Sequence, residues 1–416
     1  MPPATGAQIP TSDLIKLEWR FLIYGALMSF WSSIGQTFFI SLFSLEIREE
    51  LSLSHGEFGS IYAAATMLSA VTLFWLGKQA DNLTVFRLSL ITIIALTISA
   101  IFFSFITGVL TLIGGLYLLR LFGQGMMTHV YSVAIARRYR VARGRALAIT
   151  GVGINIAESI GPPIIVLLIA AIGWRQVWLL IPVIFFFSIV PFLSRLTQKT
   201  ALQESAANNH QTNVQKSQEI IHFRRKDLFK NREFWIVVLP LIAVPSFTIT
   251  GILFHQIFLA DQKSVTLFYW SKNYAFYALT AILGAFLSGF LIDRVSARKT
   301  SFIGHSALLF GIISLWLGQG NLFLILFFAL FGLASGMITS NTSALLAEKY
   351  GTRWLGEIKA AAQTITVTAS AISPIMLGLM IDWGFGLNGI MLVLIGISLC
   401  PVSATLINFN VLSTQN

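Results

Sequence analysis

The stretch from Arg120 to Pro163 decides the fold of this chain. It reads RLFGQGMMTHVYSVAIARRYRVARGRALAITGVGINIAESIGPP. Two long apolar segments flank a cluster of five arginines, which are Arg137, Arg138, Arg140, Arg143 and Arg145. Each apolar segment contains one side chain that is normally charged at pH 7, Arg120 in the first and Glu158 in the second. An ion in the middle of a membrane helix costs about 2.5–3.5 kcal/mol, so each side chain is expected to face a partner or a wet cavity.

The spacing of these two charges predicts their depth. Arg120 lies 17 residues before Arg137, and Glu158 lies 15 residues after Arg143. At ~1.5 Å of rise per residue, both would lie roughly 23–26 Å from the same membrane face. Two helices joined by a tight turn would then bring opposite charges to nearly one depth.

Each of the two charges has two interpretations. Arg120 could bind a substrate carboxylate or phosphate, since its planar fork matches both, or it could hold Glu158 in a structural ion pair. Glu158 could carry a proton, because burial and a nearby arginine act on it in opposite directions, or it could be the permanently ionised partner of Arg120.

The composition is that of a polytopic membrane protein. Of the 416 residues, 56% are hydrophobic and only 11% are charged, against roughly 25% charged residues in soluble proteins. The mean hydropathy is +0.78. A single cysteine, Cys400, excludes an intrachain disulfide. The first apolar segment is too long for a signal-peptide core, so we expect it to remain as the first span.

Twelve segments have the ~20 apolar residues that a spanning helix needs. They are roughly 20–45, 57–77, 88–107, 109–136, 145–171, 175–194, 233–259, 270–292, 300–318, 321–347, 357–381 and 385–408. The predicted fold class is therefore an all-α polytopic membrane protein with twelve transmembrane helices.

The basic residues predict the orientation in the membrane. With the N-terminus placed in the cytoplasm, 23 of the 28 Lys and Arg residues fall in inside segments and 4 fall in outside segments. This is the positive-inside pattern, and it places both termini in the cytoplasm. Because the basic residues alternate between loops rather than gathering on one soluble face, a nucleic-acid partner is not expected.

One long polar stretch, about 195–232, divides the spans six and six. We expect a cytoplasmic linker there, between an N-terminal half (1–194) and a C-terminal half (233–416). Its basic end, IIHFRRKDLFKNREF, is either an amphipathic helix on anionic lipid or a solvated linker.

An internal repeat relates the two halves. An offset of 212 residues links Gly77 with Gly289, Asp81 with Asp293, Gly144 with Gly356 and Pro162 with Pro374. The repeat predicts two pseudo-symmetric six-helix halves. Parallel repeats of this kind put the substrate site between the halves, near the midplane of the membrane.

With these landmarks, the whole chain resembles a major facilitator superfamily transporter. Its loop signature G-x-x-x-D-R-x-G-R-K is matched best by the second copy, with Gly289, Asp293, Arg294, Arg298 and Lys299. The first copy keeps Gly77, Asp81 and Arg87, but has Asn82 and Thr84 where Arg and Gly are usual. The resemblance implies that these loops help to latch the halves in the outward-open state.

Three further stretches carry the resemblance. RLFGQG is similar to the Arg motif of the fourth helix, although Gly123 and Gln124 depart from its usual spacing. The GPP of Gly161, Pro162 and Pro163 resembles a degenerate form of the fifth-helix motif associated with antiporters. The run at 344–360 is similar to a monocarboxylate-transporter-like bacterial branch, in which substrates vary widely.

Polar and small residues within the spans supply the candidate sites. The substrate and coupling candidates are Arg120, Gln124, Asn155, Glu158, His255, Gln256, Tyr277, Asn341 and Gln363. The plainer interpretation of His255 is an interfacial histidine, and that of Trp270, Tyr274 and Tyr277 is an interfacial aromatic belt. The hinge candidates are Gly161, Pro162, Pro163 and Pro374, for which close helix packing is the alternative.

Signatures of enzymes and cofactors are missing from the sequence. It has no G-x-x-x-x-G-K-[ST] loop for a nucleotide, and its six histidines and one cysteine have no metal-ligand spacing, so we expect no cofactor. The resulting hypothesis is a secondary transporter, a monomer in the cytoplasmic membrane of a bacterium. It would work by alternating access and couple protons to the movement of a small organic anion such as a carboxylate. The alternatives are proton-antiport efflux of lipophilic drugs, an uncoupled facilitator and, last, a transport-dead receptor or intramembrane enzyme.

Overall fold

The structure is a computed structural model, and it describes residues 11–77, 79–139, 142–197, 225–351 and 354–406. The described residues form helices and no strand, which confirms the predicted all-α class. Most of the predicted linker, residues 195–232, lies outside the described residues.

The first part of the chain contains both long and short helices. In order they are α1 (Thr11–Trp31), η1 (Ser32–Gly35), α2 (Thr37–Ile40), η2 (Ser41–Phe43), α3 (Ser44–Leu51), α4 (His55–Leu76), α5 (Gln79–Asn82), α6 (Val85–Ser104), α7 (Val109–Leu119), η3 (Arg120–Met127), α8 (Thr128–Arg138), α9 (Arg143–Ile172) and α10 (Trp174–Leu196). Of these, η3 is a π-helical segment that joins α7 and α8.

The second part of the described chain contains ten helical elements, the first of which lies within the predicted linker. They are α12 (Arg225–Lys230), the π-helical η4 (Phe234–Val238), α13 (Leu239–Phe254), α14 (Gln256–Gln262), α15 (Leu267–Lys272), α16 (Tyr274–Arg294), α17 (Ala297–Leu317), α18 (Asn321–Tyr350), α19 (Leu355–Asp382) and α20 (Leu387–Leu406).

The helices agree with the predicted number of membrane spans. Within the described residues, 11 helices are long and apolar enough to cross a membrane. A bent pair, Leu14–Gly35 and Thr37–Leu51, makes 12 if the two segments, inclined by 49°, form one span. The shortest predicted turns, between spans 3 and 4 and between spans 9 and 10, also fall at glycines in the structure. Gly108 directly precedes α7, and Gly318 directly follows α17.

Packing groups the chain into two units. Unit 1 comprises Met1–Ile40, Leu68–Ala157 and Leu167–Lys216, and unit 2 comprises Ser41–Met67, Glu158–Val166 and Ser217–Asn416. The units follow packing rather than chain order, since α4 and α9 each contribute to both. The division of the sequence at 194 and 233 stays a prediction.

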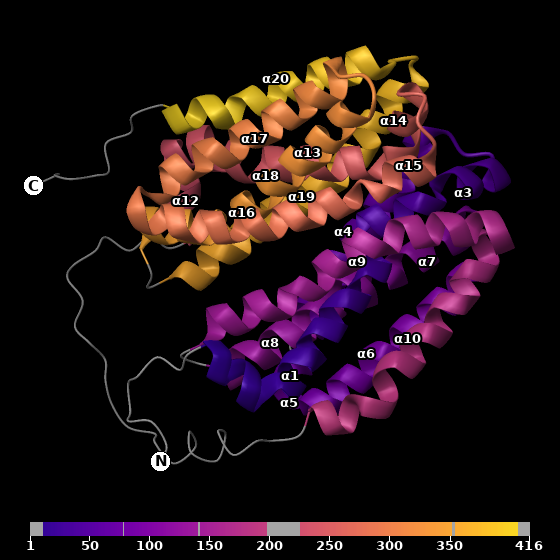
Figure 1. The fold of residues 1–416 in the computed structure, drawn as a ribbon, viewed down its shortest axis with the longest axis vertical. Coiled ribbons are helices and arrows are strands. Elements are labelled where there is room, and N and C mark those ends of the chain that lie inside the picture. The colour runs from indigo at the N-terminus through magenta and orange to yellow at the C-terminus, as the bar shows by residue number, and fades with distance from the viewer. Residues whose placement is uncertain (1–10, 78, 140–141, 198–224, 352–353, 407–416) are drawn as a thin grey trace, which may run out of the picture. The chain divides into compact units, whose positions relative to one another are not determined.

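In unit 1, α6 lies along α10 and also contacts α7 (Figure 1). The α1 helix packs against α8, and η1 packs against the π-helical segment η3. One backbone contact depends on glycine, because a Cβ on Gly153 would lie 2.0 Å from the carbonyl oxygen of Ala26. Small residues let membrane helices approach this closely.

Unit 2 is built around α18, which packs against both α16 and α17, while α13 packs against α19 (Figure 1). The contact between α16 and α18 is also made by glycines. A Cβ on Gly336 would lie 1.9 Å from the Ala281 carbonyl oxygen, and one on Gly332 would lie 2.1 Å from that of Tyr277. The repeat appears locally, since α9 and α19 begin at Arg143 and Leu355 with the same offset of 212 residues.

Candidate functional site

In unit 1, the candidate Arg120 begins the π-helical segment η3. The backbone there approaches η1 so closely that a Cβ on Gly123 would lie 2.6 Å from the Gly35 nitrogen. The Arg120 side chain is buried, and its Nη1 donates to the Gly35 carbonyl at 3.1 Å. Single π-turns inside helices are frequent at functional sites. Arg120 is thus held against the break between η1 and α2 (Thr37–Ile40), next to the half-buried Gln124.

In unit 2, Glu158 of α9 interacts electrostatically with two tyrosines of α16. It is half-buried, and the two tyrosines are Tyr274 and Tyr277. The Tyr277 hydroxyl donates to Ser335 Oγ at 3.0 Å. The carboxyl group therefore lies near phenol groups that are themselves fixed by hydrogen bonds.

A buried chain of hydrogen bonds continues from Tyr274. Its hydroxyl donates to Gln256 Oε1 at 2.9 Å, and Gln256 Nε2 donates to Ser41 Oγ at 2.7 Å. Ser41 in turn donates to the carbonyl oxygen of Leu253 at 2.7 Å. The side chains of Tyr274, Gln256 and Ser41 are fully buried, so this chain ties η2, α13, α14 and α16 together within unit 2.

A second polar contact in unit 2 joins the first turn of α4 to the end of α19. The Asp382 carboxylate accepts from the backbone nitrogens of His55, at 3.0 Å, and Gly56, at 2.8 Å. One helical turn along, a Cβ on Gly59 would lie 2.3 Å from the Pro374 carbonyl oxygen. That same oxygen accepts from His255 Nε2 at 3.1 Å.

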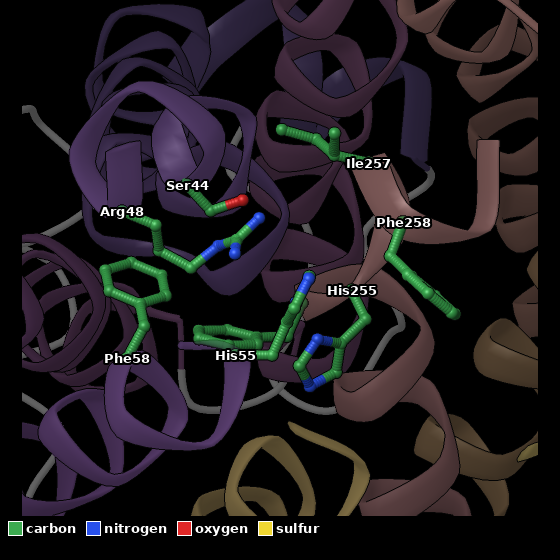
Figure 2. A pocket seen from close by; sticks show the side chains of 8 residues that line it. Ser44, Arg48, His55, Phe58, His255, Ile257 and Phe258 are labelled. Atoms are coloured by element: carbon green, nitrogen blue, oxygen red, sulfur yellow. The ribbon is translucent and has the colours of Figure 1, made fainter. Parts of the chain in front are cut away.

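A hollow lies beside this contact, close to the ends of α3, α4 and α13. Figure 2 shows it, and its lining residues are Ser44, Arg48, His55, Phe58, Phe254, His255, Ile257 and Phe258. Its cavity volume is about 10 Å³, which is room for about one water molecule.

The structure corrects the placement of four residues that sequence patterns put at the membrane interface. His255 is 5% exposed, Trp270 1%, Tyr274 0% and Tyr277 4%. They are buried inside unit 2, where the rings of Trp270 and Tyr274 contact Phe328 of α18 and the ring of Tyr277 contacts Phe331. Aromatic residues near the end of a span suit both positions, so the sequence pattern does not distinguish them.

The remaining polar candidates have simpler surroundings. Asn155 Nδ2 donates to the Gly151 carbonyl of its own helix at 3.3 Å. Asn341 Nδ2 donates to the Ala297 carbonyl and to Ser301 Oγ, which ties α18 to α17. Gln363 is exposed on α19.

The hinge candidates lie inside long helices. Pro162 and Pro163 are within α9, and Pro374 is within α19. A Cβ on Gly161 would meet nothing within 4 Å. Close packing therefore does not explain this glycine, whereas it does explain Gly153 of the same helix.

The candidate gating loops follow α4 and α16. Gly77 follows α4 directly, Asp81 lies in α5 with a side chain outside the described ones, and Arg87 lies in the first turn of α6. In the second copy, Gly289 and the exposed Asp293 lie in α16. Arg294 stacks on Phe290 at 4.0 Å, and Arg298 Nε donates to the Thr405 carbonyl at 2.9 Å.

Sequence reasoning missed Arg48, Ser41 and Asp382. Asp382 gave a weak signal, since it is an acidic residue at the end of an apolar run. The Ser54 and Glu57 pair at the start of α4 forms a capping box that the sequence displays as S-x-x-E. Neither the acidic residue nor the capping box predicts that the start of α4 contacts the end of α19. In the described part of the chain, no group of three or more His, Cys, Asp or Glu residues could hold a metal ion.

Comparisons with known proteins agree with this architecture. A bacterial homologue of the human lysosomal transporter Spinster, solved inward-facing and occupied, has a TM-score of 0.69 at 14% identity, with 96% of each chain covered. The nucleoside transporter NupG has a TM-score of 0.71 at 13% identity, covering 94% of this chain and 98% of that one. At such identities, these likenesses show the fold alone.

One curated relative is similar over a shorter stretch. The facilitated glucose transporter member 2 of solute carrier family 2, from Sus scrofa, is 27% identical over 143 residues. This match covers 34% of the chain and about a quarter, 27%, of that relative's length. The sequence profile of the Major Facilitator Superfamily matches residues 25–374 and, in an overlapping second match, 241–408. The chain therefore belongs to the major facilitator superfamily, whose members are membrane transporters that work by alternating access.

Proposed function

We propose that this protein couples protons to the transport of a small organic anion, such as a carboxylate, across the cytoplasmic membrane of a bacterium. It would act as a monomer, with both termini in the cytoplasm and the substrate site between its two halves. The observation that carries the proposal is the position of Glu158, a carboxyl group within a membrane helix that interacts electrostatically with Tyr274 and Tyr277.

The surroundings of Glu158 favour a reversible charge. Among the described residues of its own unit, Glu158 forms no ion pair and no hydrogen bond. An ionised carboxylate without a partner is costly away from water, and uptake of a proton removes that cost. Proton loss would then be favourable when water or a cation reaches the group, which is what a proton carrier needs.

Arg120 is the proposed contact for the anion. It is buried at the π-turn of a membrane helix, and a guanidinium offers two parallel N–H groups to a carboxylate. Its hydrogen bond to the Gly35 carbonyl uses Nη1, which would fix the side chain before substrate arrives. A structural pair between Arg120 and Glu158 remains the alternative role for both residues.

The test is flux in proteoliposomes with Glu158→Gln, because the amide keeps the shape of the side chain but cannot release a proton. For one proton per substrate, a pH difference of one unit supports at most about tenfold accumulation. We expect the variant to lose this accumulation and to retain substrate exchange at equal pH. Asp261→Asn, at an exposed carboxylate of α14, is the matched control. Unchanged accumulation in Glu158→Gln would show that Glu158 is not the carrier.

The substrate class is tested separately by thermal stabilisation of the purified protein. The ligands are mono- and dicarboxylates, amino acids, a hexose, a nucleoside and lipophilic cations, since the similar proteins include a glucose and a nucleoside transporter by name. A ligand at ~100 times its dissociation constant stabilises by about 2.7 kcal/mol. Stabilisation by a carboxylate that is lost in Arg120→Ala supports the proposal. Stabilisation by lipophilic cations alone would favour drug efflux, to which the GPP sequence at 161–163 also points.

A further inference from the structure

We propose that His305 is a proton-binding site of unit 2, in which the bound proton completes a contact between α17 and α13. His305 belongs to α17 and is buried, with 2% of its surface exposed. The two helices pack against each other within unit 2 (Figure 1). The proposed transport mechanism does not use His305, and this proton site does not rest on Glu158.

The ring of His305 has a carbonyl oxygen at each of its two nitrogens. Its Nδ1 lies 2.7 Å from the Ser301 carbonyl oxygen of α17, and its Nε2 lies 3.1 Å from the Leu241 carbonyl oxygen of α13. A carbonyl oxygen only accepts hydrogen bonds, whereas a neutral imidazole has a hydrogen on one nitrogen and a lone pair on the other. The neutral ring therefore makes one of these bonds and turns a lone pair toward the second oxygen. The protonated ring donates to both oxygens.

Pro245 explains why the Leu241 carbonyl needs a donor from another helix. In an α-helix this carbonyl would accept from the backbone nitrogen four residues later. In α13 that nitrogen belongs to Pro245, which has no N–H. Freed carbonyls of membrane helices are satisfied by neighbouring groups, and here the neighbouring group is His305 Nε2. The Nε2 hydrogen is thus used by α13, so a second proton on Nδ1 is what turns the contact with Ser301 into a hydrogen bond.

Asn341 of α18 fixes the turn of α17 that carries the Ser301 carbonyl. Its Nδ2 donates to Ser301 Oγ at 2.6 Å and to the Ala297 carbonyl at 2.8 Å. Ser301 and Asn341 are both buried. With this turn held by α18, the unfavourable contact of a neutral ring is relieved either by protonation of Nδ1 or by separation of α17 from α13.

In the part of the chain that the structure describes, no charged side chain acts on His305. Burial and its two hydrogen bonds are the influences on the ring. The α13 helix has no ionisable side chain, and α20 has only Cys400, which is exposed. The ionisable side chains of α16, α17 and α18 exert no electrostatic effect on His305; they are Tyr274, Tyr277, Asp293, Arg294, Arg298, Lys299, Glu348, Lys349 and Tyr350.

These influences make the proton at His305 depend on the position of α13. Burial opposes the charge, because an ion away from water is costly. The second hydrogen bond favours the charge, because a charged donor makes a stronger bond to a carbonyl than a neutral one does. His305 therefore holds its proton while both carbonyls are within reach and releases it when α13 moves away. By linkage, proton uptake draws α17 and α13 together.

The experiment is solid-state NMR of the full-length protein in lipid bilayers, with isotopically labelled histidine rings and leucine carbonyls. The His305 signal is assigned by its transfer from a leucine carbonyl, since the rings of His129 and His255 contact Gly77 and Pro374 instead. We expect both ring nitrogens of His305 to carry a proton at about pH 5 and only one of them at about pH 8. A ring that stays neutral down to about pH 5 overturns the proposal.

Pro245→Ala tests the part that α13 has in this site. Alanine supplies the missing backbone N–H to the Leu241 carbonyl and competes with His305 Nε2. The pH at which His305 takes up its proton should then fall by about one unit, because a hydrogen bond from a charged group is weakened. Pro191→Ala, at an exposed proline within α10, is the matched control and should leave this pH unchanged.

The same titration in Pro245→Ala and in the unmodified protein overturns the proposed link between the proton and α13. A fall in Pro245→Ala alone supports it. The NMR titration does not measure flux, so the proposed function stands or falls separately, on accumulation in proteoliposomes with Glu158→Gln.

Discussion

Replacing Asp382 with alanine should loosen the first turn of α4. The first four N–H groups of a helix have no partner within the helix, and Asp382 accepts from two of them, those of His55 and Gly56. Loss of an N-terminal capping side chain costs about 0.5–2 kcal/mol. The bond to Gly56 is partly buried and the bond to His55 is exposed, so water can replace only part of the loss. We expect a cost of about 1.5 kcal/mol, which is roughly tenfold in the opening equilibrium.

Amide hydrogen exchange measures this effect where it occurs. In Asp382→Ala, the amides of His55 and Gly56 should exchange roughly tenfold faster, because local opening sets their protection. The capping box of Ser54 and Glu57 remains in the variant. Exchange further along α4 should therefore change little.

A second substitution reaches the same contact from the other side. A Cβ on Gly56 would lie 2.7 Å from Asp382 Oδ2, so Gly56→Ala should displace the carboxylate and give a similar acceleration. Because both changes break one contact, the double variant should show less than the sum of the two effects. Asp261→Ala, at an exposed position of α14, is the control. Protection of the two amides within twofold of the unmodified protein in Asp382→Ala would refute the reasoning.

Two further predictions concern unit 1. Gly123→Ala should lower the melting temperature, because its Cβ would lie 2.6 Å from the Gly35 nitrogen and such overpacking destabilises the folded state by about 1–3 kcal/mol. Gly161→Ala is the control and should leave the melting temperature unchanged, because its Cβ would meet nothing within 4 Å. Burial, and the hydrogen bond and charge of Glu18, raise the pKa of Tyr139. Its contribution to stability is therefore present below its usual pKa of about 10 and is lost as the pH rises above it. Between about pH 9 and about pH 11, the melting temperature should fall more steeply with rising pH for the unmodified protein than for Tyr139→Phe. Equal slopes for the two proteins would contradict this.

The spans could be predicted because each depends on its own residues. A helix in lipid satisfies its backbone internally and needs only a run of apolar side chains. The turns before α7 and before α18 were therefore visible at Gly108 and Gly318. The position of Arg120 within a span was visible for the same reason.

The surroundings of Arg120 could not be predicted, because they depend on a distant segment. The π-turn at Arg120–Met127 is accompanied by the close approach of Gly35, 85 residues earlier in the chain. The sequence shows Gly35 and Gly123 but does not show that they approach each other. The hydrogen bond between His55 and Asp382 could not be predicted for the same reason, because 327 residues separate the two. Burial of Trp270 was also hidden, because an aromatic residue at the end of a span fits an interface equally well.

Alternating access requires helix ends to separate, and the two polar contacts of unit 2 differ in what separation costs. Gln256 and Ser41 are fully buried, so parting them would leave unsatisfied groups, at about 1–3 kcal/mol for each group that water does not reach. The bond from His55 to Asp382 is exposed, so water can take the place of each partner as it opens. Gly56 and Gly59 of α4 have no side chains, so no side chain has to withdraw from α19 at these two positions. The first turn of α4 should therefore leave α19 before Gln256 leaves Ser41, since the contact that water can replace is the easier one to break.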